Sequence, residues 1–392
     1  MIEFLSYISL FLLIFDITIP PFGGGIGSAP FAILLSLFSI AIDNDKKNVY
    51  KRFFTILLEF KPVLLLYLLV NIYSLFRMIL VKDGNTLFIT SLLRADIFLI
   101  STITYLISFN QNDLPKKILN VFFFNAIIAL TIGSFPQYQY LVDFFKISSE
   151  ELIGYNPYRN AFLAGSGYFG IGAPYALVTG FYLLYLSTYS YTNNYINYIK
   201  LLVIAVAGIL AARTAVLAIG LAVIYLLVYK RDPKTIMGII FLLSLLYFIL
   251  NLEFFAAYKD WLSEVFNPKE SSTVETLTTD FLVIPTNSIT FIFGDGKYTN
   301  FDGSYYMYTD IGYMRHWYFG GIIYMLSIVS IPLLLYFKNL NKHFLFLIVP
   351  IVLVLHFKGV FIFGSPIGMP LLFLISHILY QRRLAKKSNI AK

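Results

Sequence analysis

Residues 59–81 read EFKPVLLLYLLVNIYSLFRMILV and form an almost unbroken apolar run. A helix needs about 20 such residues to cross roughly 30 Å of hydrocarbon, and lipid offers no partner to an unpaired backbone group. The same reasoning predicts about twelve spans, at 4–19, 28–42, 59–81, 86–108, 118–134, 171–188, 199–212, 214–229, 235–251, 316–337, 343–357 and 359–380. We therefore expect an all-α, polytopic integral membrane protein in which residues 1–392 form a single membrane domain.

The composition supports this class and excludes others. The 392 residues are 58% hydrophobic and only 13% charged, whereas an average soluble domain has roughly 25% charged residues. A soluble globular enzyme would lack the polar residues to cover its surface, and the same numbers exclude a disordered chain. The chain has no cysteine, which excludes disulfides, a thiol nucleophile and cysteine-based metal sites.

The basic residues indicate how the spans are oriented. Counted from a cytoplasmic amino terminus, the even-numbered connections and the C-terminal tail carry most of the lysines and arginines. Positive residues favour the cytoplasmic side of a membrane, so both termini are expected to be cytoplasmic. The net charge of +8 reflects this topology. Nucleic acid is not an expected partner, because the basic residues lie in separate short loops and not on one face.

Two connections on the expected outer side are long, about 135–170 and about 252–315. Loops of such length usually carry function, and the second holds nine of the 21 acidic residues. Nucleotides are not available outside the cytoplasm, so a reaction there needs a substrate activated in advance, such as a lipid diphosphate. The chain has four histidines, none paired at helical i, i+4 spacing, so no metal site is predicted.

Three segments together resemble the O-antigen polymerase and O-antigen ligase superfamily. The first is RNAFLAGSGYFGIGAP (159–174), in which Arg159 is followed after ten residues by Gly170, as in the Arg-x10-Gly pattern of such polymerases. The second, GILAARTAVLAIGLAVIYLL (208–227), is similar to the family's small-residue turn with a central arginine. The third, FGDGKYTNFDGSYYMYTDIGYMRHWYFGGII (293–323), resembles its late outer-loop pattern.

The resemblance implies a membrane glycosyltransferase. Such an enzyme polymerises undecaprenyl-diphosphate-linked repeat units into O-antigen or a related surface polysaccharide at the periplasmic face of the bacterial inner membrane. Its partners would be the lipid-linked glycan, membrane lipid and a potential chain-length regulator, and it would need no cofactor or metal. Two alternatives stay open: an O-antigen ligase that uses lipid A core as acceptor, and a flippase or transporter of lipid-linked oligosaccharide. The third segment lacks the His-Asn pair of ligases, which favours a polymerase.

Arginines are the candidates for binding the diphosphate. Arginine is always charged and binds phosphate through two parallel hydrogen bonds, and cations aimed at the leaving group stabilise its developing charge. We expect Arg213 at the outer rim of the bilayer, between two tightly joined spans, with Arg159 and Arg315 contributing from the loops. Gly170 belongs to the same substrate-binding set. The alternative for Arg213 is an arginine that extends from a helix end to the membrane surface.

Arg94 lies inside the fourth expected span. It is a candidate for a groove that holds lipid or glycan, because charges inside a membrane are rare and often functional. The alternative is a structural ion pair between helices. Asp96 is not the expected partner, since the two residues lie on nearly opposite faces of one helix.

The acceptor hydroxyl must lose a proton during attack, so a general base is needed. Asp310 and His316 are the catalytic candidates, with Asp295 and Asp302 as alternatives to Asp310. Arg315 and His316 are expected just before a helix that begins near Trp317, where its positive end would favour phosphate. Asp310 is close enough in sequence to share a pocket with both. Its structural alternative is a helix cap or a turn residue.

Overall fold

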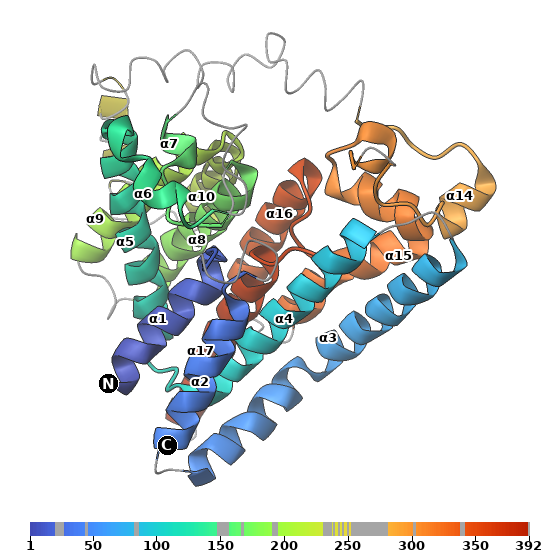
Figure 1. Ribbon diagram of the computed structural model, residues 1–392. Coiled ribbons are helices and arrows are strands. Elements are labelled where there is room, and N and C mark those ends of the chain that lie inside the picture. The colour runs from blue at the N-terminus through green and yellow to red at the C-terminus, as the bar shows by residue number, and fades with distance from the viewer. Residues whose placement is uncertain are drawn as a thin grey trace.

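In the computed structural model, helices run back and forth along an elongated bundle, with both termini at one end (Figure 1). The structure describes residues 1–19, 27–43, 46–81, 86–146, 157–165, 168–189, 195–229, 281–300, 303–337 and 342–390, with single positions between 237 and 251. Much of both expected outer loops, and Asp302 with them, therefore lies outside the described residues.

The described residues are overwhelmingly helical. The long helices are α1 (Ile2–Phe15), α2 (Ala29–Ile42), α3 (Lys46–Leu80), α4 (Thr86–Ser108), α5 (Leu114–Ser134), α8 (Phe169–Thr188), α9 (Tyr195–Ala211), α10 (Thr214–Tyr229), α15 (Gly312–Phe337), α16 (Lys342–Lys358) and α17 (Gly368–Ile390). Short helices connect them: η2 (Pro136–Tyr138), α6 (Tyr140–Asp143), α7 (Pro157–Asn160), α14 (Ser288–Phe293) and η5 (Tyr306–Tyr308). Extended pairing in this part of the chain is limited to one bridge, between Thr299 and Tyr305.

Five helices, α3, α4, α5, α8 and α15, are long and apolar enough to cross a membrane. They make the chain an all-helical protein of membrane character, as its composition predicts. The expected segment 235–251 lies largely outside the described residues, so the number of twelve spans stays a prediction. Several boundaries differ from the expected ones: α3 begins at Lys46 and not at 59, α15 begins at Gly312 and not at 316, and the segment expected at 359–380 becomes helical only at Gly368. The residues before it form a turn in which Gly364 has a φ of 72°.

The helices differ in how they are covered. In the most apolar part of α8, 89% of the residues are buried, against 22% in α3. α8 packs against α9, α10 and α16 and is the centre of the bundle, whereas the leucines and isoleucines of α3 form an exposed apolar surface that suits contact with lipid. Burying tyrosines is costly unless their hydroxyls are paired. In α8, Tyr175 donates to Phe122 O at 3.2 Å and Tyr182 donates to Pro115 O, which ties α8 to α5.

Arg94 forms the structural ion pair that was the alternative to a glycan groove. Its guanidinium pairs with Asp16, the residue that ends α1, and their side chains are 17% and 3% exposed. Arg94 therefore joins α4 to α1, and its part in a glycan groove stays a prediction. Asp96 is separate from this pair, as its position on the helix predicts, and accepts a hydrogen bond from Asn71 at 3.1 Å.

Removing the Asp16 charge should destabilise the bundle. We expect Asp16→Asn to lower the free energy of unfolding by about 3 kcal/mol, because Arg94 then keeps a buried charge without its counter-ion. The measurement is an SDS titration of the purified protein in mixed micelles. The matched control is Asp43→Asn, which breaks the more exposed pair with Arg52 (3.4 Å) and should cost less than about 1 kcal/mol. Equal losses for the two variants would contradict the structural role of the Asp16 pair.

Candidate functional site

The third quoted segment folds as one unit around the start of α15. This helix breaks at Gly321, where φ is 81° and ψ is 179°. Asp295 and Gly296 donate their backbone N–H groups to the carbonyls just before the break, at 2.6 and 3.0 Å. Those carbonyls have no helical partner beyond the break, so the loop after α14 caps a short helical piece of α15 and fixes its position.

The start of this piece differs from the expectation. α15 begins at Gly312 and not near Trp317, so Arg315 and His316 lie within its first turns and do not precede it. Asp310 takes the place just before the helix. The sequence pattern missed this because Gly312 and Tyr313 do not look apolar, although Gly312 fits closely against the backbone at the end of α16.

Three cations and one carboxylate gather at one end of the bundle. Lys358, the last residue of α16, interacts electrostatically with Arg159 of α7, with Arg213 of the turn between α9 and α10, and with Asp310. Arg159 also donates from Nε to Ala211 O, the end of α9, at 3.3 Å. Three predicted site residues from distant parts of the chain thus lie within electrostatic range of a lysine that was not predicted. We call Arg159, Arg213, Lys358 and Asp310 the cation cluster.

Close backbone contacts position the cation cluster. A Cβ atom added to Gly172, in the first turn of α8, would lie 2.3 Å from Ala212 Cβ in the turn that carries Arg213. A Cβ atom on Gly359, which follows Lys358, would lie 2.7 Å from the Phe169 ring at the start of α8. The amino end of α8, and Gly170 with it, is therefore wedged between the elements that supply the cations.

Three helix amino ends meet at the cluster. α8 begins next to Tyr168, whose ring lies 4.0 Å from the Arg159 guanidinium. α10 begins directly after Arg213, and α15 begins two residues after Asp310. Helix amino ends carry partial positive charge and free N–H groups, which favours bound anions. Both the side chains and the backbone of this region therefore suit a ligand of high negative charge.

Tyr168 adopts an unusual backbone conformation beside this cluster. Its φ is 52°, a region that bulky residues rarely adopt and that costs of order 1–3 kcal/mol. The contact between its ring and the Arg159 guanidinium adds attraction between a cation and an aromatic face. Strain of this kind tends to persist where the surrounding structure holds a functional group in place, which here is Arg159.

Arg315 lies beside the cluster within a group of aromatic rings. Its guanidinium is 3.6 Å from the Tyr305 ring centre and 4.4 Å from that of Tyr298. It also interacts electrostatically with His356, two residues before Lys358 on α16. Its Nε is buried and has no hydrogen-bond partner among the described residues. Burial raises the pKa of the Tyr298 hydroxyl, so this phenol stays protonated at neutral pH.

His316 is fully buried. Its ring stacks on that of His356 with centres 5.2 Å apart, and within the described part of the chain neither of its nitrogens has a hydrogen-bond partner. A substrate could reach this imidazole only after the surrounding aromatic rings move. Asp310 is partly exposed and lies within reach of Lys358, so it is the more accessible of the two predicted bases.

Asp295 is occupied by structural contacts. It accepts hydrogen bonds from Thr290 Oγ1 at 2.7 Å and from the Tyr306 hydroxyl at 3.1 Å. Burial, and then the negative charge of Asp295, raise the pKa of Tyr306 to about 12, so its hydroxyl remains a donor to this carboxylate. Asp295 therefore holds the loop together, and Asp302, the other alternative base, lies outside the described residues.

Lys358 is the cluster residue that the sequence reasoning missed. It separates the expected spans 343–357 and 359–380 and is a lone basic residue in a very short connection on the outer side. Arg213 was selected by the same signal, a charge held between two tightly joined spans. Among the described residues, no group of three or more histidine, aspartate or glutamate side chains is placed to hold a metal ion.

The fit of Gly172 against the Arg213 turn can be tested by adding one methyl group. We expect Gly172→Ala to lower the melting temperature of the detergent-solubilised protein, because overpacking at a close contact typically costs about 1–3 kcal/mol. Gly220 of α10 is the control, since a Cβ atom there meets nothing within 4 Å. Gly220→Ala should leave the melting temperature unchanged or raise it, because alanine favours helix. An unchanged melting temperature for Gly172→Ala, together with a lower one for Gly220→Ala, would show that α8 does not pack closely against the Arg213 turn.

Comparisons of the sequence with protein families and with curated proteins identify no relative of this chain. A scan against models of protein families finds no match to the chain. A search of curated proteins finds no significant match either.

Proposed function

We propose that this protein polymerises lipid-diphosphate-linked oligosaccharide repeat units, with the cation cluster as its reaction centre. The observation that carries the proposal is the meeting of Arg159, Arg213 and Lys358 at three helix amino ends. Such an arrangement fits a diphosphate with two or more negative charges better than it fits a neutral sugar. The cluster lies at one end of an apolar helix bundle, which is where the headgroup of a membrane-anchored diphosphate would be.

The reaction needs three roles. The acceptor hydroxyl oxygen attacks the anomeric carbon of the donor sugar, and the bond from that carbon to the diphosphate oxygen breaks through an oxocarbenium-like transition state. Asp310 accepts the proton of the hydroxyl as general base. The electron pair of the broken bond leaves with the lipid diphosphate, whose developing charge Arg159, Arg213 and Lys358 stabilise. No external co-reactant is required.

The aromatic group around Arg315 supports the binding of glycan. Tyr305 is 43% exposed and its ring centre lies 3.6 Å from the Arg315 guanidinium, and aromatic faces pack against sugar C–H groups while phenols donate hydrogen bonds. Arg315 is available from the same side to contact phosphate or sugar oxygens. We further propose that the chain crosses the inner membrane twelve times, with both termini in the cytoplasm and the cation cluster at the periplasmic face.

The proposal predicts a large loss of activity in Arg213→Ala. Removing one preorganised donor from the leaving group should lower kcat about 10²-fold or more, and Arg213→Lys should recover only part of it because lysine lacks the two-pronged geometry. The measurement is the ladder of chain lengths that the purified protein makes from an undecaprenyl-diphosphate-linked repeat unit. Arg52→Ala, at the other end of the bundle, is the control and should leave the ladder unchanged.

Two results of that experiment would reject the polymerase. A normal ladder from Arg213→Ala at equal protein level would remove the cluster from the chemistry. Transfer of preformed polymer to lipid A core, without any growth of the ladder, would identify a ligase instead.

The role of Asp310 makes a separate prediction. We expect Asp310→Asn to lower kcat with little change in KM, because a general base acts mainly in the transition state. The loss should be of order 10²–10⁴-fold, measured as the initial rate of dimer formation from single repeat units. His316→Gln, which alters a buried ring, should affect stability more than rate. A large loss of rate in His316→Gln, together with little loss of rate in Asp310→Asn, would assign the general base to His316.

A further inference from the structure

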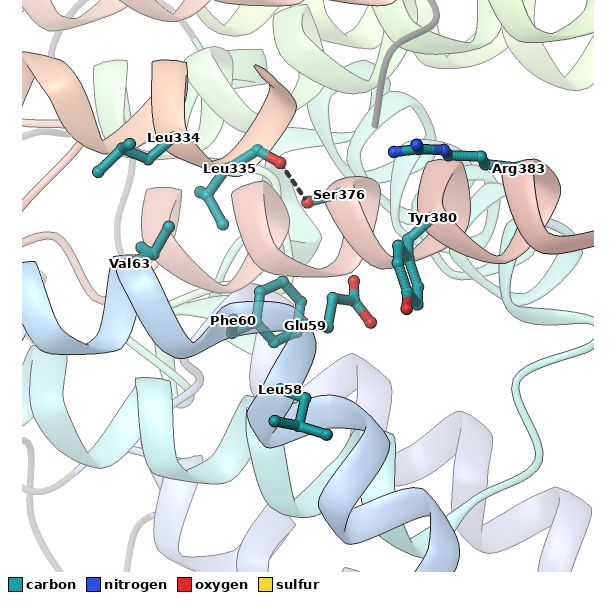
Figure 2. A pocket seen from close by; sticks show the side chains of 9 residues that line it. All are labelled: Leu58, Glu59, Phe60, Val63, Leu334, Leu335, Ser376, Tyr380 and Arg383. Carbon is teal, nitrogen blue, oxygen red and sulfur yellow. Dashed lines mark hydrogen bonds between the residues drawn. The ribbon is translucent and has the colours of Figure 1, made fainter. Parts of the chain in front are cut away.

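A cavity of about 250 Å³ lies between α3, α15 and α17 (Figure 2). Glu59 and Leu58 of α3 line it from one side. Tyr380 and Arg383, one turn apart on α17, line it from the other. The cavity is separate from everything that the proposed function uses.

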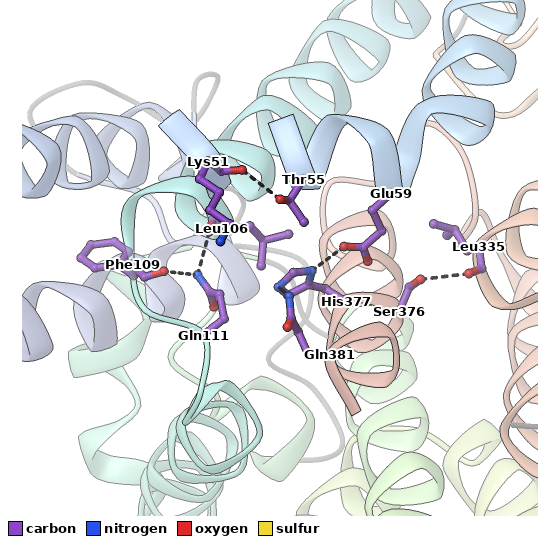
Figure 3. Close-up of polar contacts among 10 residues, drawn as sticks. All are labelled: Lys51, Thr55, Glu59, Leu106, Phe109, Gln111, Leu335, Ser376, His377 and Gln381. Carbon is purple, nitrogen blue, oxygen red and sulfur yellow. Dashed lines mark hydrogen bonds and ion pairs between the residues drawn. The ribbon is translucent and has the colours of Figure 1, made fainter. Parts of the chain in front are cut away.

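Glu59 is the unusual group in this cavity. Its side chain is 4% exposed, and its Oε2 lies 2.8 Å from Nδ1 of His377, whose other nitrogen is 3.4 Å from Gln381 Nε2 (Figure 3). Its Oε1 is buried, and among the described residues no donor reaches it. A buried carboxylate oxygen without a donor is costly. The cavity that Glu59 lines is therefore suited to a ligand that brings a donor, preferably a cation.

The other residues that line the cavity indicate which further groups a ligand would carry. Arg383 supplies a positive charge and Tyr380 a hydroxyl, which together suit a phosphate group. Leu58 is 66% exposed and Leu334 is 37% exposed, so the rim of the cavity is apolar and open to the surroundings of the bundle. A ligand that fits has an ammonium group, a phosphate close to it, and hydrocarbon attached to the phosphate end.

The depth of the cavity fits the headgroup region of a bilayer. Glu59 lies 21 residues before Leu80, the end of α3, which at 1.5 Å per residue is about 32 Å. This is close to the roughly 30 Å thickness of the hydrocarbon. The end of α3 lies beside the loop between α14 and α15, where Arg77 Nη2 donates to Gly294 O at 2.8 Å. If this end of α3 lies at one boundary of the membrane, Glu59 lies at the opposite boundary.

We propose that this cavity binds the headgroup of a phosphatidylethanolamine-type lipid. Its primary ammonium donates to Oε1 of Glu59, its phosphate accepts from Arg383 and Tyr380, and its acyl chains follow the apolar rim at Leu58 and Leu334. A glycerol headgroup is uncharged beyond its phosphate, so it brings hydroxyl donors but no positive charge to offset the Glu59 carboxylate, and a choline headgroup has no N–H to donate. The site therefore selects the ethanolamine headgroup.

The test uses the full-length protein and lipids of matched acyl chains, with affinity measured by native mass spectrometry. The lipid series runs from phosphatidylethanolamine through its N-methyl and N,N-dimethyl forms to phosphatidylcholine, with phosphatidylglycerol alongside. We expect the affinity to fall as N–H donors are removed, by about tenfold from the first lipid to phosphatidylcholine. This part of the experiment needs no variant and so does not depend on how a variant folds.

Glu59→Gln should abolish the preference among these lipids, whereas Glu3→Gln, an exposed carboxylate at the same end of the bundle, should keep it. Arg383→Gln should weaken all phosphate-bearing lipids alike. Equal affinity across the lipid series for the unaltered protein would overturn the proposal, and so would an unchanged preference in Glu59→Gln. Free phosphoethanolamine that binds as tightly as the lipid would overturn the assignment to a lipid. None of these outcomes depends on the activity at the cation cluster.

Discussion

The gathering of like charges at the end of α16 is the constraint on which the proposed function depends. Arg159, Arg213 and Lys358 repel one another, and Asp310 offsets only one of the three charges, so the cluster carries a net charge of +2. Three helix amino ends add further positive potential. The proposed function depends on this net positive charge, because a multiply charged anion such as a diphosphate would offset the repulsion among the three cations.

Rigid scaffolding allows the bundle to hold these charges together. α8 is buried along most of its length, and its tyrosines are tied by hydrogen bonds to α5. Its amino end contacts both the Arg213 turn and the end of α16 through glycines, which let the backbones approach closely. The ion pair between Asp16 and Arg94 similarly fixes α1 against α4.

The sequence predicted the elements well where the signal was local. The helical class, the apolar spans and the tight turn around Arg213 follow from hydropathy and spacing over fewer than about 25 residues. The start of α15 was wrong because its first turn is polar or small and is held by packing against α16. The partner of Arg94 did not follow from the sequence, because Asp16 is 78 residues away in the chain and no local pattern indicates such a contact. Lys358 was overlooked although it carries the same signal as Arg213.

The two ends of the bundle show how burial and pairing distinguish kinds of site. At the cation cluster, several partly exposed charges of one sign converge, which favours a strongly charged ligand that can enter and leave. At Glu59, one carboxylate is buried with half of its hydrogen-bonding capacity used by His377. The other oxygen of Glu59 is buried without a donor among the described residues. In the proposed lipid site, this oxygen favours a headgroup with N–H donors, and the total charge of the headgroup matters less. A transient substrate therefore fits the first site, and a resident lipid fits the second.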